Sequence, residues 1–328
     1  MKGQGMSSKV YACYLKDEQE LMRSSSGGAY TALTNAVFRN GGTVIACAYD
    51  YEDHTLKFDL AKTAEARNRM RGSKYIQADS DNLYLLLERA LSEGSDTDLL
   101  VVGTPCQIAG AKSWLKIKNR KIDRNIIFCD LMCHGVSSPV MWREYITNLE
   151  EEHYSKTTFV TFKDKEKGWL RPTAKVAFEN GEIALAEDYA ILYRSDDFMR
   201  DSCYNCKFSR IERVSDLTIG DFWKIGEVDR EFANLRGTSM VLTHTESGQR
   251  LFDTACAEMY VKERTMDECL QPNMQYPTPI RKRYSDIHRD YSRKGLHFVI
   301  KKYVHYGEGN ALAMRIRRKW HRMKYEGK

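Results

Sequence analysis

The sequence lacks the features that define secreted and membrane proteins. Its first residues, "MKGQGMSSKVYACYLKDEQE", contain no apolar run of the kind found in a signal peptide. No other stretch approaches the about 20 consecutive apolar residues that a membrane-spanning helix needs. Internal repeats and low-complexity tracts are absent as well, so nothing indicates a repeat protein. We therefore expect a cytoplasmic protein.

Proline is scarce, and its distribution marks a boundary. Three of the six prolines lie in the segment "LQPNMQYPTPI" at 270–280, which is typical of a linker. We expect a flavin-side N-terminal subdomain over 8–95, a second subdomain over 96–268, and a linker with a helical basic tail over 269–328. The first of these three assignments rests on the family resemblance given below.

The positive charge is concentrated at the end of the chain. The net charge is +6, but residues 281–328 alone carry fifteen Lys and Arg against four Asp and Glu. Met314, Trp320 and Met323 are spaced among the basic residues, a pattern compatible with an amphipathic helix at the inner face of an anionic membrane or on an acidic partner. A solvated helix that packs on the body through Trp320 is the alternative. We expect no nucleic-acid partner.

The order of predicted elements indicates an α/β fold with a mixed, largely parallel sheet flanked by helices. Helix, apolar strand and loop alternate through "NLYLLLERALSEG", "DLLVVGTPCQ", "IAGAKSWLKIKN", "NIIFCDLMCHG" and "SPVMWREYITNLEEEH". This rhythm is typical of parallel sheets, in which functional groups gather at the carboxyl ends of the strands. Residues 156–187 alternate like an inserted antiparallel hairpin with a turn at Gly181.

The nine cysteines raise the question of a metal or redox site. Cys203 and Cys206 form a lone C-x-x-C in a polar, loop-like segment, which leaves thioredoxin-type chemistry, half of a metal site and two ordinary thiols open. Cys106 and Cys133 follow predicted strands, so these four could form an all-cysteine site for zinc or a 4Fe-4S cluster. The other five are expected to pack in the core: Cys13, Cys47, Cys129, Cys256 and Cys269.

Other stretches have weaker functional readings. "SSSGG" at 24–28 opens a predicted helix and could bind a phosphate, although a plain helix cap fits as well. "RGSKY" at 71–75 suits an anion or a solvated basic turn. His134 could bind a flavin or a substrate, or only brace its loop. Asp216 and Asp221, which bracket a short strand, favour a structural role, and Phe222 and Trp223 a core or pocket wall.

Six motifs taken in order resemble one family. "SSSGG", "RGSKY", "GTPCQIAG", "CHGVSSP", "FKDKEKGW" and "CYNCKF…DLTIGDFW" are similar to the beta subunit of coenzyme F420 hydrogenase/dehydrogenase and its bacterial relatives, over roughly residues 8 to 265. Members are flavoproteins that bind FAD and a 4Fe-4S cluster and pass electrons to a deazaflavin or another acceptor. The resemblance therefore implies an oxidoreductase.

The resemblance also implies site residues. It makes Cys106, Cys133, Cys203 and Cys206 the cluster ligands and His134 a catalytic candidate. The residues expected near the flavin are Ser25, Ser26, Gly27, Gly28, Arg71, Ser73, Lys74, Gly103 and Thr104.

The expected partners follow from one difference between this sequence and its relatives. Many bacterial relatives carry a ferredoxin module that is missing here, so we expect a separate electron donor such as a ferredoxin. Relatives of this type occur in polysaccharide synthesis, which makes a glycan precursor a candidate acceptor. The competing hypothesis is a zinc-stabilised accessory binding protein of a glycan-assembly pathway, whose four cysteines are structural.

Overall fold

The computed structural model describes residues 8–93, 96–118, 125–170 and 173–305. Two sheets organise these residues, and the larger one has eight strands. In spatial order its strands are β11 (Met259–Arg264), β1 (Lys9–Leu15), β10 (Ser239–Thr243), β9 (Leu217–Asp221), β5 (Ile126–Leu131), β4 (Leu99–Gly103), β2 (Thr43–Asp50) and β3 (Thr55–Ala61).

The centre of the large sheet is parallel. β2, β4, β5 and β9 run in one direction, and the remaining strands pair antiparallel at the two sides. The predicted mixed sheet is therefore confirmed. β4, "LLVVG", is buried along its whole length because Leu99 and Val101 face one hydrophobic core while Leu100 and Val102 face the other. A central parallel strand needs apolar residues at every position for this reason.

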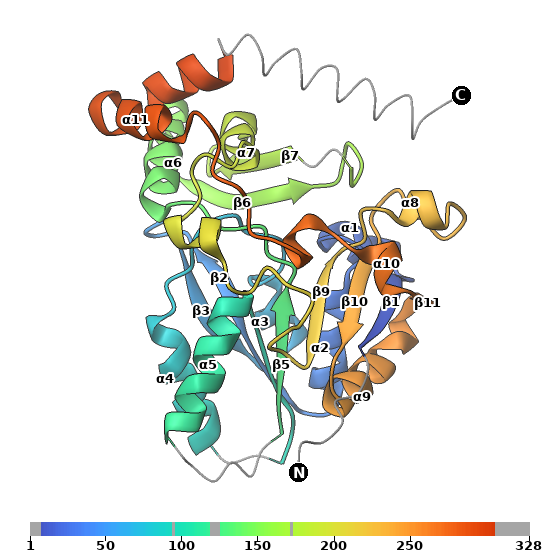
Figure 1. Ribbon diagram of the computed structural model, residues 1–328. Helices are drawn as coiled ribbons and strands as arrows, with labels where there is room; N and C mark the ends of the chain where they lie inside the picture. The colour runs from blue at the N-terminus through green and yellow to red at the C-terminus, as the bar shows by residue number, and fades with distance from the viewer. Residues whose placement is uncertain (1–7, 94–95, 119–124, 171–172, 306–328) are drawn as a thin grey trace.

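Helices cover both faces of the sheet (Figure 1). α2 (Ala29–Arg39) and α9 (Glu246–Ala255) pack on one face, and α4 (Asp81–Ser92) and α5 (Pro105–Lys118) on the other. The shorter helices are α1 (Glu18–Arg23), α3 (Ala64–Asn68), α8 (Ile225–Val228) and α10 (Met266–Cys269). Short 3-10 helices are η1 (Asp201–Asn205), η2 (Cys256–Glu258) and η3 (Pro272–Met274).

A second unit lies beyond the carboxyl ends of the parallel strands, toward which β5 points in Figure 1. It holds a three-stranded antiparallel sheet of β6 (Thr157–Asp164), β7 (Thr173–Phe178) and β8 (Ile183–Leu185), with the predicted turn at Gly181. The predicted two-stranded hairpin is therefore part of a three-stranded sheet, in which β8 is the additional strand. Helices α6 (Pro139–His153), α7 (Glu187–Arg194) and α11 (Tyr284–Val299) pack against it, and the π-helix η4 (Ile300–His305) follows.

The expected subdomain division cuts through the large sheet. β1, β2 and β3 belong to residues 8–95, yet β1 lies between β10 and β11 from the second segment. The chain before and after residue 96 therefore shares one sheet, and the subdomain boundaries stay a prediction. The basic tail is helical over 284–305, whereas Met314, Trp320 and Met323 lie outside the described residues. None of the helices in the described ranges has the length and apolar character that crossing a membrane requires.

Gly27 is where the fold leaves no room for a side chain. A Cβ there would lie 2.2 Å from the carbonyl oxygen of Cys13 and 2.5 Å from the backbone nitrogen of Ser239. Both neighbours are backbone atoms of central strands and cannot move cheaply. The glycine is thus required by packing, whatever the loop binds.

We predict that Gly27→Ala lowers the free energy of unfolding by more than about 3 kcal/mol, as measured by denaturant unfolding. Gly72→Ala is the matched control, because Gly72 has a φ of +86° but a Cβ on it would have no neighbour within 4 Å. Only conformational strain of about 1–2 kcal/mol applies there. Equal losses in the two variants would contradict the packing argument.

Candidate functional site

The four expected ligand cysteines come from three loops at the carboxyl edge of the parallel strands. Gly103 pairs with Asp130 across β4 and β5, and Leu131 pairs with Ile219 across β5 and β9. Cys106 follows β4 by three residues and lies in the first turn of α5, where its Sγ is 3.2 Å from Oγ1 of Thr104. Cys133 follows β5 by two residues. The parallel register therefore brings the two loops to one edge.

Backbone hydrogen bonds attach the C-x-x-C segment to the Cys133 loop. Cys203 lies in η1, and its backbone N–H donates to Arg200 O at 2.7 Å. The N–H of Arg200 donates in turn to Val136 O at 2.8 Å. Gly135 has a φ of +139°, and a Cβ on it would be 3.4 Å from the Cβ of Cys203. The loops that carry Cys133 and Cys203 are therefore in direct contact.

Electrostatics places all four thiols in one neighbourhood. Burial raises the pKa of Cys133 to about 12, and Cys106, Cys203 and Cys206 each contribute to this rise. The pKa of Cys203 is also raised, first by burial and then by Cys106 and Cys206. Because the negative charge of the Cys133 and Cys203 thiolates is disfavoured, a bound cationic group that stabilises these thiolates would be favourable.

The described residues form no site for a single metal ion. Across the described ranges, no group of three or more His, Cys, Asp or Glu side chains is close enough to hold one metal ion. Zinc needs four donors about 2.3 Å from one centre. A 4Fe-4S cluster holds its four cysteines farther apart, since each thiolate binds a different iron atom. The two groups would hold the four cysteines differently, and the choice between them stays a prediction.

A buried ion pair fixes the loop that follows the C-x-x-C. The Nη2 of Arg213 donates to Oδ1 of Asp130 at 3.0 Å, and these two side chains are 2% and 0% exposed. Arg213 also donates to Thr218 Oγ1 at 3.3 Å and to Phe208 O at 3.2 Å. One guanidinium thus connects β5, β9 and the 206–216 segment. Sequence reasoning missed Arg213, because nothing local distinguishes it from the other arginines of this basic loop.

His134 has a carboxylate partner. Its Nε2 lies 2.8 Å from Oδ1 of Asp196, which also pairs with Arg281. Its ring meets Tyr193 edge-on at 5.7 Å, and Tyr193 donates to Gly135 O at 2.9 Å. Asp196 has a lowered pKa because His134 and Arg281 outweigh its burial. The imidazole is therefore held in one orientation beside Cys133, with 37% of the side chain exposed.

The polar groups of the "SSSGG" loop are already hydrogen-bonded to other segments of the chain. Ser25 Oγ accepts from the N–H of Ser73 at 2.8 Å and lies 3.0 Å from Ser73 Oγ, so the two motifs predicted to face the flavin meet. Ser26 Oγ donates to Thr238 O at 2.8 Å. The N–H groups of Gly27 and Ala29 donate to Ser239 Oγ at 2.9 and 3.4 Å. A phosphate at this helix start would have to replace Ser239, so a flavin role for Ser25, Ser26, Gly27 and Gly28 stays a prediction.

The remaining predicted flavin residues are held in the same way. Lys74 donates to three carbonyl oxygens, those of Met70, Arg71 and Gly72, at 2.8–3.1 Å. The N–H and the hydroxyl of Thr104, which follows Gly103, both donate to Gln107 Oε1. Arg71 pairs with Glu20. Contact of these residues with a flavin also stays a prediction.

The "FKDKEKGW" motif holds buried charges to which sequence reasoning gave no role. Lys163 pairs with Asp221, which also accepts from Trp169 Nε1 at 2.8 Å. Lys165 donates to Leu21 O at 2.7 Å and to Ser26 O at 2.6 Å. The available signal was the pair of lysines two residues apart at the end of a predicted strand, one inside it and one directly after it. Asp216 accepts from Phe128 N–H and Thr245 Oγ1, as its favoured structural reading expects.

These features describe an α/β protein with a cysteine-lined site at a sheet edge, and comparison identifies its family. Residues 96–268, more than half of the chain, match the family described as the C terminus of the coenzyme F420 hydrogenase/dehydrogenase beta subunit. The chain belongs to this family, as the sequence motifs predicted. The family assigns it a redox role of the oxidoreductase type. A search of curated proteins found no match.

A solved structure shares the fold. A chain of the F420-reducing [NiFe] hydrogenase complex from Methanosarcina barkeri superposes with a TM-score of 0.52 and 19% sequence identity. The match covers 79% of this chain and 82% of that chain. At this identity the likeness establishes the architecture, and the cofactors of this chain have to be argued from its own residues.

We predict that Arg213→Ala lowers the free energy of unfolding by about 3–5 kcal/mol, because it leaves Asp130 buried without a counter-ion. Denaturant unfolding measures the change. Arg89→Ala on α4 is the control, since the Arg89–Glu93 pair is solvent-exposed and should cost below about 1 kcal/mol. Adding Asp130→Leu to Arg213→Met should restore much of the loss. Similar small effects of Arg213→Ala and Arg89→Ala would refute the role of the buried pair.

Lys165 predicts a pH dependence. Burial lowers its pKa from the ordinary 10.5 to about 7. Between these values the unfolded chain holds the proton that the folded chain releases, so stability is lost as the pH falls from 10.5 toward 7. Lys165→Met should flatten this slope by up to about 1.4 kcal/mol per pH unit in pH-resolved unfolding. Lys167 is exposed, so Lys167→Met should leave the pH dependence of the free energy of unfolding unchanged. If Lys165→Met shows the same pH dependence as the wild type, the role of Lys165 is disproved.

Proposed function

We propose that the protein is an iron–sulfur flavoprotein oxidoreductase that passes electrons between a 4Fe-4S cluster, FAD and an external acceptor. The observation that carries the proposal is the position of Cys106, Cys133, Cys203 and Cys206 on three loops at one sheet edge, where Cys133 is within electrostatic range of the other three thiols. Cytosolic cysteines gathered in this way serve as soft ligands, because thiolates select iron–sulfur clusters or zinc. Membership of the family, whose members the motif resemblance associates with a 4Fe-4S cluster, favours the cluster over zinc.

In the proposed site each cysteine would hold one iron of the cluster, which supplies one-electron transfer, while FAD supplies two-electron chemistry. The chain itself fixes the geometry. Arg213 ties the C-x-x-C loop to β5, and the Gly135 backbone lies against Cys203. His134, which contacts Asp196, lies beside the Cys133 loop.

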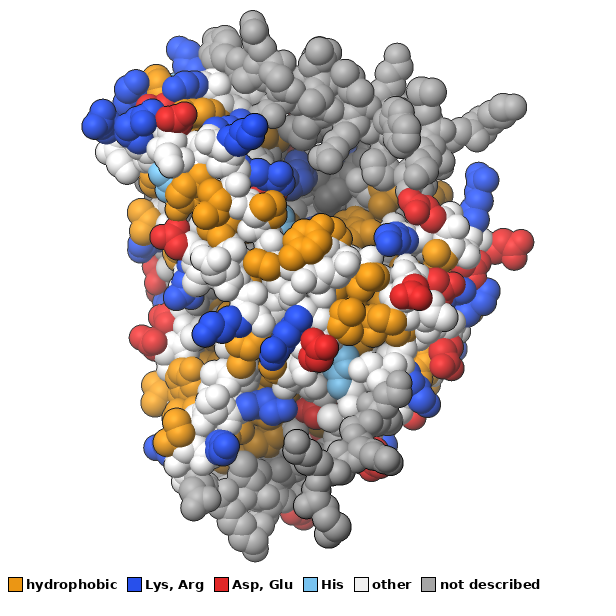
Figure 2. All heavy atoms as spheres, viewed as in Figure 1, with side chains coloured by type: hydrophobic (Ala, Val, Ile, Leu, Met, Phe, Trp, Pro, Cys, Tyr) orange, Lys and Arg blue, Asp and Glu red, His pale blue; other side chains and the backbone are white. Residues whose placement is uncertain are grey.

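The surface near the cysteines fits a protein electron donor. Figure 2 shows Lys and Arg side chains mixed with apolar ones on the face in front of β5. On the 206–216 segment Lys207, Arg210 and Ile211 are exposed, with Glu212 as the acidic neighbour. A cationic surface with an apolar centre suits an acidic partner such as a ferredoxin, because complementary charge speeds encounter. We infer that electrons enter at this face.

We predict that replacing any of Cys106, Cys133, Cys203 or Cys206 by Ala strips or converts the cluster. Iron and acid-labile sulfide in anaerobically purified protein should fall well below the wild-type content, since each iron needs its own thiolate. The melting temperature should fall as well, because the cluster ties three loops together.

Cys269→Ala and Cys129→Ala are matched controls. Both thiols are buried, and Cys269 bonds only within α10 while Cys129 lies inside β5. Their variants should keep full iron and lose only packing energy, about 1 kcal/mol. Wild-type protein that contains zinc and neither iron nor flavin would refute the proposed function and support the zinc-stabilised binding protein instead.

A further inference from the structure

Helix α3 and the "RGSKY" motif together bury more positive charge than their ion pairs neutralise. Arg67 is 1% exposed, and the side chain of Arg71 is 9% exposed. Lys74 is half-buried, and desolvation lowers its pKa to about 8. Glu20 pairs with Arg71, but in the described ranges neither Arg67 nor Lys74 forms an ion pair. Glu20 and Glu258 favour the charge of Arg67 electrostatically, but among the described residues no carboxylate bonds its guanidinium, and a buried cation without a bonded counter-ion is costly.

Unused hydrogen-bond donors converge on the same place. Arg67 donates from Nη2 to Asn35 Oδ1 at 3.0 Å, while its Nε and Nη1 have no partner among the described residues. The Nε of Arg71 and the hydroxyl of Tyr30 have none either. These four atoms come from three residues, although buried polar groups in proteins are nearly always bonded. Each therefore calls for an acceptor.

The three side chains are neighbours. Burial lowers the pKa of Arg67 to about 10, with the positive charge of Arg71 acting in the same direction and Tyr30 opposing it. Burial raises the pKa of Tyr30, against the opposing influence of Arg67 and Arg71. Cys47 in the carboxyl half of β2 is within electrostatic range of Tyr30 and Lys74. The cluster thus lies toward the same sheet edge as the cysteine loops.

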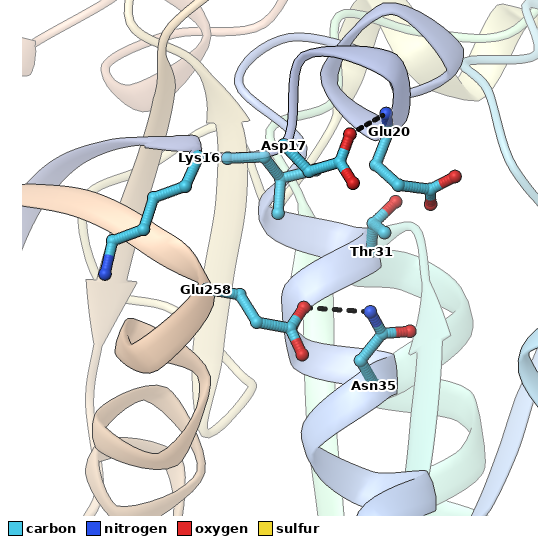
Figure 3. A pocket seen from close by; sticks show the side chains of 7 residues that line it. Lys16, Asp17, Glu20, Thr31, Asn35 and Glu258 are labelled. Carbon is cyan, nitrogen blue, oxygen red and sulfur yellow. Dashed lines mark hydrogen bonds between the residues drawn. The ribbon is translucent and has the colours of Figure 1, made fainter.

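A cavity of about 350 Å³ is lined by Glu20 and Asn35 (Figure 3), which bond Arg71 and Arg67 respectively. Its wall also includes Thr31, Asp17 and Glu258. The three carboxylates of this wall are already engaged: Asp17 caps α1, Glu20 binds Arg71 and Arg23, and Glu258 binds Arg39 and Asn35. Arg67, Arg71 and Tyr30 do not line the cavity, so an anion can reach them from it only if Glu20 and Asn35 move aside.

We propose that Arg67, Arg71 and Tyr30 form a binding site for a phosphate-class anion that enters from this cavity. Two guanidinium groups and a phenol offer several converging donors, which suits the multiple oxygens of a phosphate or diphosphate. The anion is a phosphate of the bound FAD or of a phosphorylated substrate. The FAD assignment rests on the proposed function; the site itself does not. It moves phosphate binding from the "SSSGG" amides, which Ser239 already satisfies, to the arginines.

The test compares flavin-free full-length variants in inorganic pyrophosphate and in sodium chloride of equal ionic strength. Pyrophosphate should raise the melting temperature of the wild type. Arg67→Met should abolish this rise and, without anion, melt no lower than the wild type, because an unpaired buried cation is gone. Arg39→Met is the matched control: Arg39 pairs with Glu258 at the same cavity but is 44% exposed, and its variant should keep the rise.

Tyr30→Phe, which removes only the unpartnered hydroxyl, should weaken pyrophosphate binding by about tenfold and guards against a folding defect in Arg67→Met. A second arm separates the sources of the anion. A pyrophosphate response that disappears on saturation with FAD assigns the site to the flavin phosphates, and one that persists assigns it to a phosphorylated substrate.

The outcomes separate this site from the proposed function. An undiminished rise in Arg67→Met and Tyr30→Phe, or an equal loss in Arg39→Met, overturns the site. A protein that never binds flavin but needs Arg67 for its pyrophosphate response keeps the site and refutes the flavoprotein. Tight FAD binding unaffected by Arg67→Met, with no pyrophosphate response in the wild type, does the reverse.

Discussion

The buried ion pair between Asp130 and Arg213 is the interaction on which the geometry of the cysteine site depends. Asp130 lies in the centre of the sheet, next to Gly103 of β4 and Thr218 of β9. Arg213 reaches it from a surface loop that begins at the C-x-x-C. Because a buried carboxylate without its partner is costly, the pair holds the loop in one position over the strand ends. Two cysteines on strand ends can then meet two on a distant loop.

Charge is the common theme of the buried polar groups at this sheet edge. The pair Lys163–Asp221 is closed, and Lys165 binds two carbonyl oxygens. Around Arg67 several hydrogen-bond donors have no acceptor among the described residues. Burial also disfavours the thiolates that a cluster would require. Both the thiols and the arginines are thus arranged at a cost that a bound cofactor or anion would offset.

The fold followed from local patterns wherever burial on both faces left a simple signature. "LLVV" and "IIFC" are apolar at every position, since each lies between two cores, and they form β4 and most of β5. The predicted helices and the turn at Gly181 are also present in the structure, because they too depend on local sequence patterns. The antiparallel insertion of β1 between β10 and β11 was not predictable, because nothing in "KVYACYL" encodes which distant strand it joins.

The sequence by itself determined the family and the parallel core, since these rest on motif order and on apolar periodicity, which are local. It also placed Cys106 and Cys133 at strand ends. Only the tertiary structure decided that Arg213 anchors the C-x-x-C loop, that Ser239 occupies the "SSSGG" amides, and that Arg67 lacks a counter-ion among the described residues. The physical reason is the same in each case: the burial and partners of a polar side chain depend on residues far away along the chain, or on their absence.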